Sequence, residues 1–228
     1  MALYAMGDLH LSLGVAKPMD VFGGVWEGYL EKLNQGVSVI GPGDTTVLLG
    51  DLTWGMDLNQ ARADFAWINR IPGRKIILKG NHDYWWTTRR KMDDYLQSRG
   101  FDTLRIVHNS AEAVGDYAVC GTRGWFYDAE QDADRKVLLR EVGRLNLSID
   151  AAEKTGKEPV VFLHYPPVMG EAECPEIMDV LRKRSIRLCY YGHIHGPGAR
   201  RTPVKTVDGI TLRLVSCDAV GFTPVLVR

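Results

Sequence analysis

The sequence has 228 residues, of which 45% are hydrophobic and 25% are charged, the proportions of an ordinary globular protein with a sizeable core. The 28 basic and 28 acidic residues cancel, which excludes a global basic field that would hold nucleic acid. No run of about 18 apolar residues is present, so the sequence predicts no membrane-spanning helix.

The first half of the chain alternates apolar strands with amphipathic helices. We predict strands at 2–6, 45–49 and 75–78, and helices at 20–34, 60–70 and about 88–99. Each strand leads into a glycine that is followed by a polar residue, in the pairs Gly7-Asp8, Gly50-Asp51 and Gly80-Asn81. Parallel strands bring their carboxyl ends to one edge of a sheet, where ligands bind. We therefore expect one site at this edge rather than three unrelated turns.

The second half repeats the arrangement. Strands are predicted at 117–120, 160–163 and 188–191, with helices at 132–154 and 175–184 between them. Residues 205–216 are typical of a hairpin that turns at Asp208-Gly209, and 224–227 of an edge strand. No fixed repeat, low-complexity segment or linker interrupts the pattern. The sequence thus predicts one α/β domain, residues 1–228, with two sheets.

The cysteines and the beginning of the chain bear on where the protein works. The four cysteines form no Cys-x-x-Cys pair, which argues against a thiolate zinc site or a redox motif. Asp8 comes only seven residues after Met1, and residues 2–6 already form the strand that leads to it. We therefore expect no cleaved signal peptide, and a soluble cytoplasmic protein.

Five of the six histidines lie in short motifs at the strand ends. Neutral imidazole and carboxylate together are the ligands of borderline divalent transition metals. Each motif alone is most often a turn or a core histidine, but their ordered occurrence favours a metal site; His108, which has no such partner, is interpreted as structural. The seven candidate ligands are Asp8, His10, Asp51, Asn81, His164, His193 and His195.

The series Asp-x-His, Gly-Asp, Gly-Asn-His-Asp, a lone His and Gly-His-x-His, over residues 7–195, resembles the calcineurin-like metallophosphoesterase superfamily. This resemblance implies a two-sheet α/β/β/α sandwich and two metal ions. It implies that one metal is held by Asp8, His10 and His195, and the other by Asn81, His164 and His193. Asp51 would bridge both, and His82 would be the catalytic general acid.

The implied chemistry is phosphoester hydrolysis by a metal-bridging hydroxide, with His82 protonating the leaving oxygen. The carboxylates of Asp8 and Asp51 against two divalent ions leave a charge of about +2, which attracts a phosphate. We expect manganese, iron or zinc, alone or as a mixed-valence pair. Magnesium alone is disfavoured because imidazole ligands suit it poorly.

One position departs from the superfamily pattern. Many members carry an acidic residue three positions after the bridging aspartate, where it orients the general-acid histidine, and Trp54 stands there in this chain. Either Asp57 or Asp83 supports His82 instead, or His82 is less well tuned.

Two residues are candidates for binding substrate. Arg123, in a glycine-rich stretch after a strand, either contacts a substrate phosphate or forms a surface ion pair. Trp85, in Tyr84-Trp85-Trp86, either stacks on the substrate at the rim of the site or packs the following helix onto the sheet.

Three functional classes remain open at this stage. The first is a phosphatase or phosphodiesterase that acts on a small phosphoester, which the compact length favours. The second is a nuclease of the same superfamily, since a nucleic acid substrate is not excluded. The third is a non-catalytic binding scaffold, which the retention of His82 and all seven ligand positions disfavours.

Overall fold

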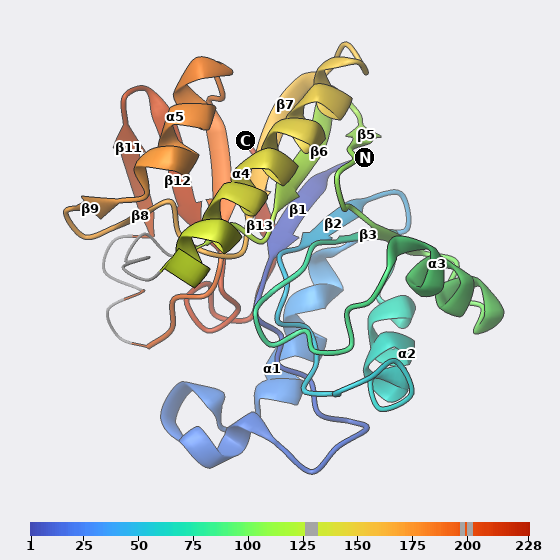
Figure 1. Ribbon diagram of the computed structural model, residues 1–228. Helices are drawn as coiled ribbons and strands as arrows, with labels where there is room; N and C mark the ends of the chain where they lie inside the picture. Colours follow the sequence, from blue (N-terminus) through green and yellow to red (C-terminus); the bar gives the residue numbers. More distant parts are fainter. Residues whose placement is uncertain (126–131, 197–198, 200–202) are drawn as a thin grey trace.

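The computed structural model describes residues 1–125, 132–196, 199 and 203–228, which form two large mixed β-sheets packed face to face (Figure 1). The first sheet has five strands in the order β13-β1-β2-β3-β4. The second has six strands in the order β11-β12-β10-β7-β6-β5, and β8 and β9 form a separate small hairpin.

The bounds of the strands follow their order along the chain. The strands of the first sheet are β1 (Leu3–Met6), β2 (Thr45–Leu48), β3 (Arg74–Ile77), β4 (Leu104–Ile106) and β13 (Val225–Leu226). Those of the second are β5 (Glu112–Val114), β6 (Tyr117–Thr122), β7 (Glu158–Leu163), β10 (Leu188–Tyr191), β11 (Val204–Val207) and β12 (Ile210–Leu214). The small hairpin consists of β8 (Val168–Met169) and β9 (Ala172–Glu173).

Helices cover the outer face of each sheet. The first sheet is covered by α1 (Tyr29–Gly36), α2 (Arg62–Arg70) and α3 (Arg89–Ser98). The second is covered by α4 (Asp132–Glu153) and α5 (Pro175–Lys183). Three short 3₁₀ turns, η1 (Met19–Phe22), η2 (Gly24–Trp26) and η3 (Val37–Val39), flank α1. The layers confirm the α/β/β/α sandwich that the family resemblance implies.

The alternation of side chains along the strands explains the layers. Strands β1 to β4 are parallel, and Ala5 pairs in register with Val47, which pairs with Ile76. These three side chains belong to the core between the sheets, whereas their neighbours one residue on belong to the core beneath α1 to α3. Since the central strands, such as β2 and β7, are covered on both faces, they are almost continuously apolar.

The predicted helix at 20–34 is wrong in its first half. Residues 19–26 form the two turns η1 and η2, and the α-helix begins only at Tyr29. Gly23, Gly24 and Gly28 have φ angles of 61°, 56° and 62°, the left-handed region that ends a right-handed helix. This segment lies at the bottom of Figure 1, in blue, beyond the edge of the first sheet.

The other predicted elements are found within a few residues of their expected bounds. Strands β4 and β5 and the small β8–β9 hairpin were not predicted, because strands of two or three residues give no readable alternation. No helix in the described part of the chain is long and apolar enough to cross a membrane.

Candidate metal centre

The two sheets are joined at the edge where their parallel strands end. The backbone N–H of Gly7, just after β1, donates to Val215 O at 2.8 Å, and Gly7 O accepts from Cys217 N at 3.0 Å. This bridge connects the end of β1 to the end of β12. The loops that follow β1, β2, β3, β7 and β10 therefore converge on one region, which is where the seven candidate ligands lie.

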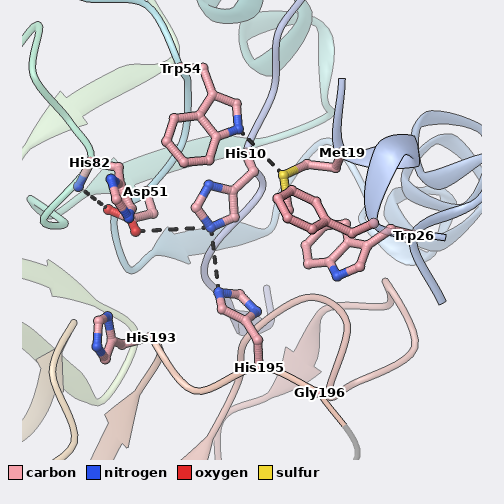
Figure 2. A pocket seen from close by; sticks show the side chains of 10 residues that line it. His10, Met19, Trp26, Asp51, Trp54, His82, His193, His195 and Gly196 are labelled. Carbon is pink, nitrogen blue, oxygen red and sulfur yellow. Dashed lines mark hydrogen bonds and ion pairs between the residues drawn. The ribbon is translucent and has the colours of Figure 1, made fainter. Parts of the chain in front are cut away.

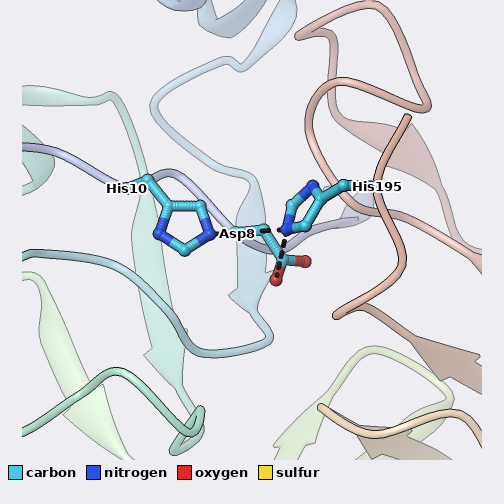
Figure 3. A group of neighbouring side chains, drawn as sticks. All are labelled: Asp8, His10 and His195. Atoms are coloured by element: carbon cyan, nitrogen blue, oxygen red, sulfur yellow. Dashed lines mark hydrogen bonds and ion pairs between the residues drawn. The ribbon is translucent and has the colours of Figure 1, made fainter. Parts of the chain in front are cut away.

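Two groups of side chains offer ligand atoms that all lie within 4.8 Å of one another, and Asp8 belongs to both. The first group is Asp8, His10 and His195, shown in Figure 3. In it, Nε2 of His10 lies 3.4 Å from Nε2 of His195, which lies 3.6 Å from Oδ1 of Asp8. The second group is Asp8, Asp51 and His164.

Asp51, a member of the second group, also faces the first group. Its Oδ2 is 3.9 Å from Nε2 of His10 and 3.5 Å from Nε2 of His164. Its Oδ1 accepts a hydrogen bond of 2.7 Å from the backbone N–H of His82, which fixes the orientation of the carboxylate. Oδ2 therefore faces one imidazole from each group.

The tautomer of His164 provides a test of whether these residues fit a cation. Nδ1 lies 3.0 Å from the carbonyl of Leu49, which only accepts, so Nδ1 carries the proton. Burial first, and then the charge of His193, hold the pKa of His164 well below its usual value, so the ring is neutral. Nε2 is then a lone pair, yet it lies 2.6 Å from Oδ1 of Asn81, which is also an acceptor. A cation held by both atoms would relieve this contact, so the donor set fits a metal.

Asn81 also brings His193 to this side of the site. Oδ1 of Asn81 lies 2.9 Å from Nδ1 of His193, whose backbone N–H donates to both carboxylate oxygens of Asp8 at 3.1 and 3.0 Å. The structure thus brings all seven predicted ligands together at one sheet edge.

The backbone of this region is held in uncommon conformations. Asp8, His10, Asp51 and His193 have φ angles of 61°, 46°, 50° and 71°. Each such residue costs on the order of 1–3 kcal/mol, and such residues concentrate at functional sites. The surrounding sheet ends maintain the strain.

Gly80 must be a glycine because there is no room for a side chain at this position. A Cβ at Gly80 would lie far inside contact distance of Asp51 Oδ1 and of the Asp51 backbone nitrogen. The Gly-Asn motif after β3 therefore leaves room for the carboxylate that follows β2.

Asp83 anchors the loop that carries His82. Its buried carboxylate accepts hydrogen bonds from the backbone N–H groups of Asp51, Leu52 and Gly80, at 2.9, 3.0 and 2.7 Å, and from Nε1 of Trp85 at 2.9 Å. These four donors occupy its oxygens, so Asp83 supports the loop rather than the His82 ring.

The His82 ring is supported by Tyr84 rather than by a carboxylate. Among the described residues, its hydrogen-bond partner is the Tyr84 hydroxyl, 3.2 Å from Nδ1. The exposed Asp57 instead caps a turn through the backbone N–H groups of Asn59 and Gln60. Neither carboxylate proposed from the sequence holds the ring.

Trp54 stands three positions after Asp51, where many members of the superfamily have an acidic residue. It contacts the neighbouring histidines through its aromatic ring. Its ring stacks on His10, with centroids 4.9 Å apart and planes at 24°, and it lies 4.7 Å from the His82 ring. The ammonium of Lys17 lies 3.3 Å from the Trp54 centroid. Trp54 therefore sets the orientation of both imidazoles by packing.

Asp218 is a functional residue that the sequence reasoning missed. Its Oδ1 accepts from Nδ1 of His195 at 2.8 Å, and its Oδ2 accepts from the backbone N–H of Gly196 at 3.0 Å. A carboxylate on the second ring nitrogen fixes the tautomer and leaves Nε2 to face the site. The available signal was an aspartate shortly after the apolar strand β12, the same pattern as at Asp8 and Asp51.

Burial shifts the ionisation of the carboxylates. It raises the pKa of Asp8 to about 6, despite the opposing charge of His195. Burial, and then the carboxylates of Asp83 and Asp8, raise the pKa of Asp51 to about 9. The protein alone thus stabilises the anionic forms poorly, as expected where cations compensate the charge.

The imidazoles divide into two kinds. Burial lowers the pKa of His10 well below its usual value and that of His193 to about 4, so both are neutral and free to act as ligands. Burial works to lower the pKa of His195 as well, but the hydrogen bond to Asp218 and the charge of Asp8 raise it overall.

A cavity of about 370 Å³ opens beside the cluster (Figure 2). Figure 2 shows His10, Asp51 and His82 on one side of it, with Met19 and Trp26 facing them. The residues that line it are His10, Met19, Phe22, Trp26, Asp51, Trp54, His82, His193, His195 and Gly196.

The two predicted substrate-binding residues have other contacts in the structure. Trp85 is 3% exposed, packs edge-on against Phe65 at 4.8 Å, and is not among the described residues that line the cavity. Trp85 is therefore a packing residue in the core, although this contact is with α2 and not with the helix that follows it. Nη2 of Arg123 lies 3.7 Å from Oε1 of the buried Glu141, and its guanidinium lies 4.6 Å from the Trp125 centroid. Arg123 therefore makes an ion pair, within the protein rather than on its surface.

Comparison with known proteins connects this geometry to a family. A family model described as calcineurin-like phosphoesterase matches residues 1–197. A stretch of 46 residues is 46% identical to the Gene 66 protein of Mycobacterium phage L5, and it spans 20% of this chain and 22% of that protein.

Solved structures resemble the whole fold. The protein TT1561 of Thermus thermophilus superposes with a TM-score of 0.60 and 12% identity, covering 95% of this chain and 89% of that one. A protein of unknown function from Aquifex aeolicus, AQ665, has a TM-score of 0.46 and 16% identity, covering 99% and 95%. At such identities the likeness to TT1561 concerns the fold alone.

Proposed function

Because this chain belongs to the calcineurin-like phosphoesterase family, we propose that it is a dinuclear metal-dependent phosphohydrolase acting on mono- or diesters of a small organic molecule. Metal-dependent phosphoester hydrolysis in general follows from the family and from the Asp/His groups. The observation that supports two metals is the position of Asp51 Oδ2, 3.9 Å from His10 Nε2 and 3.5 Å from His164 Nε2.

In this proposal Asp8, His10 and His195 hold one cation, and Asn81, His164 and His193 hold the other. Asp51 would contact both, and Asp8 is common to the two donor groups. Manganese, iron or zinc fits the nitrogen and oxygen donors. Such cations, when bound, neutralise charge on the phosphoryl oxygens and acidify water.

The chain's own residues supply positioning and proton transfer. The backbone N–H of His82 is tied to Asp51, and its Nδ1 is next to the Tyr84 hydroxyl. Nε2 is then the atom that would give a proton to the leaving oxygen, in a ring that lines the cavity. Asp218 holds His195 so that its Nε2 faces Asp8.

The cavity favours a small substrate over nucleic acid. Its volume of about 370 Å³ lies within the range of about 300–1,000 Å³ that is usual for small-molecule sites. None of the described residues that line it is Lys or Arg. A nuclease needs several cationic contacts along the phosphate backbone, so this lining argues against one.

The proposal is tested by hydrolysis of a chromogenic phosphodiester and the matching monoester by manganese-loaded protein. Asp51→Asn is the inactive variant, and Asp57→Asn, an exposed carboxylate in a neighbouring loop, is the matched control. We expect one or both esters to be hydrolysed, with activity lost in Asp51→Asn and retained in Asp57→Asn.

The two esters separate the finer alternatives. Cleavage of the diester identifies a phosphodiesterase, and cleavage of the monoester alone a phosphatase. Protein shown by metal analysis to hold two ions, but inactive on a wide panel of mono- and diesters, would favour the scaffold and overturn the proposal.

A further inference from the structure

The cavity has two unlike halves. One half carries the ionisable side chains of the candidate metal centre, among them His10, Asp51 and His82. The other half is apolar and consists of Met19, Phe22, Trp26 and Trp54. A phosphate group and its two cations need only the first half. The second half is therefore available to the organic part of a substrate.

Most of the apolar half is held rigidly in place. Met19 and Trp26 are 6% and 7% exposed. Nε1 of Trp54 donates to Sδ of Met19 at 3.4 Å, and Trp26 packs edge-on against Phe222 with centroids 5.5 Å apart. These contacts are made within the protein, so the wall exists before any ligand binds.

The segment that carries the wall is also fastened to the body of the protein. Oδ1 of Asp20 accepts from the backbone N–H of Gly28 at 2.8 Å, and Nζ of Lys32 on α1 donates to Val25 O at 2.7 Å. Residues 19–26 thus form a fixed wall in spite of their short 3₁₀ turns.

Phe22 is the exception within this wall. It lines the cavity, yet it is 68% exposed, whereas Trp54 is already in contact with His10 and Lys17. Its neighbour Val21 is 75% exposed but is not among the described residues that line the cavity. Phe22 is therefore an aromatic ring at the cavity wall whose surface a ligand would bury.

We propose that the substrate is a phosphoester with an aromatic or similarly broad apolar group, which lies on Met19 and Trp26 and is covered by Phe22. This inference rests on the proposed function. Burial of an apolar group in a preformed apolar wall is favourable. A polyol or sugar group in the same place would lose hydrogen bonds to water without replacement. Phe22 is thus the residue that determines specificity for the organic group.

The test compares two phosphonates that cannot be hydrolysed at the C–P bond, benzylphosphonate and methylphosphonate. They share the charged head and differ in the apolar group. Binding to manganese-loaded protein is measured by calorimetry, which does not depend on turnover. We expect benzylphosphonate to bind about 10-fold more tightly, as burial of a phenyl ring predicts.

Two single substitutions test whether the preference for benzylphosphonate depends on Phe22. Phe22→Ser should weaken benzylphosphonate several-fold and leave methylphosphonate unchanged. Val21→Ser, which removes an equally exposed side chain of the same turn, should change neither.

Each failure has a separate meaning. Equal affinities of the two phosphonates, or an equal loss of both in Phe22→Ser, would overturn the aromatic assignment while leaving phosphoester hydrolysis intact. If metal-loaded protein binds neither phosphonate and hydrolyses no ester, the proposed function fails, and the inference fails with it.

Discussion

The two halves of the cavity differ in how the chain builds them. The ligand half comes from the carboxyl ends of the four parallel strands β1, β2, β3 and β10, is mostly buried, and has its orientation fixed by hydrogen bonds such as that from the backbone N–H of His82 to Asp51 Oδ1. The apolar half comes largely from residues 19–26, two short turns outside the sheets, and includes an open ring at Phe22. The chemistry thus depends on the framework common to the fold, whereas the choice of substrate depends on a segment that can change without disturbing it.

The largest expected effect is on turnover, and it comes from replacing His82 in the ligand half, the residue that we assign to proton transfer. His82→Ala should keep both metals and lose about 10²- to 10⁴-fold in the turnover of esters with poor leaving groups. Esters with a good leaving group should be affected much less. The measurement is kcat for a series of leaving groups, with His108→Ala, outside the cavity, as the matched control. Normal turnover of the poorest leaving group by His82→Ala would remove His82 from this role.

The second-largest effect concerns Asp218, which supports the ligand half through its hydrogen bond to His195. Asp218→Asn keeps an acceptor for Gly196 but removes the charge beside His195. We expect a loss of about 10- to 100-fold in metal affinity or activity. Metal titration measures it, with Asp94→Asn on the exposed face of α3 as control. An unchanged metal affinity and an unchanged activity together would contradict the role.

Metal removal tests whether the ligand half joins the two sheets. A ligand present at 100 times its Kd, bound only by the folded protein, adds about 2.7 kcal/mol of stability. In a protein of this size each kcal/mol shifts Tm by about 2–4 °C. Chelation should therefore lower Tm by several degrees, and added manganese should restore it. The same Tm after verified metal removal would mean that no metal site links these strands.

The smallest effect is the pH dependence of the metal-free protein. Burial, followed by the charges of Asp83 and Asp8, raises the pKa of Asp51 from 3.8 to about 9. Between these pH values the folded protein holds a proton that the unfolded chain has released, so stability falls as pH rises. The buried neutral histidines act in the opposite direction below about pH 7, so we expect the contribution of Asp51 to lower the Tm of the metal-free protein by a few degrees from pH 7 to pH 8.5.

Asp51→Asn should reduce this slope, since it removes the titrating group and keeps an oxygen that can accept from the His82 N–H. Asp94→Asn is again the control, and thermal unfolding at each pH is the measurement. If the slope of Asp51→Asn equals that of the wild type, Asp51 is already ionised in the folded metal-free protein.

The sequence predicted correctly which polar residues come together where a short local pattern, an apolar strand followed by a glycine, fixes their place. Asp8, Asp51 and Asn81 were found because each follows an apolar strand and a glycine, and strand ends in a parallel sheet must converge. The predicted helix at 20–34 was wrong because its apolar spacing was read without the positive φ angles of three glycines. Of the apolar residues in this stretch, Tyr29 and Leu33 pack into the core, whereas Trp26 lines the cavity wall.

By itself, the sequence determined the positions along the chain of the strands that carry the motifs, the residue types at the strand ends, and hence a candidate metal site of nitrogen and oxygen donors. These follow from local patterns, because strand length, glycine and the polar residue after it are neighbours in the chain. Only the tertiary structure decided that Asp218 orients His195, that Trp54 stacks on His10, and that Phe22 is left exposed at the cavity wall. These contacts join residues that lie far apart in the sequence, or depend on the direction of a side chain, and both are set when the two sheets and residues 19–26 pack together.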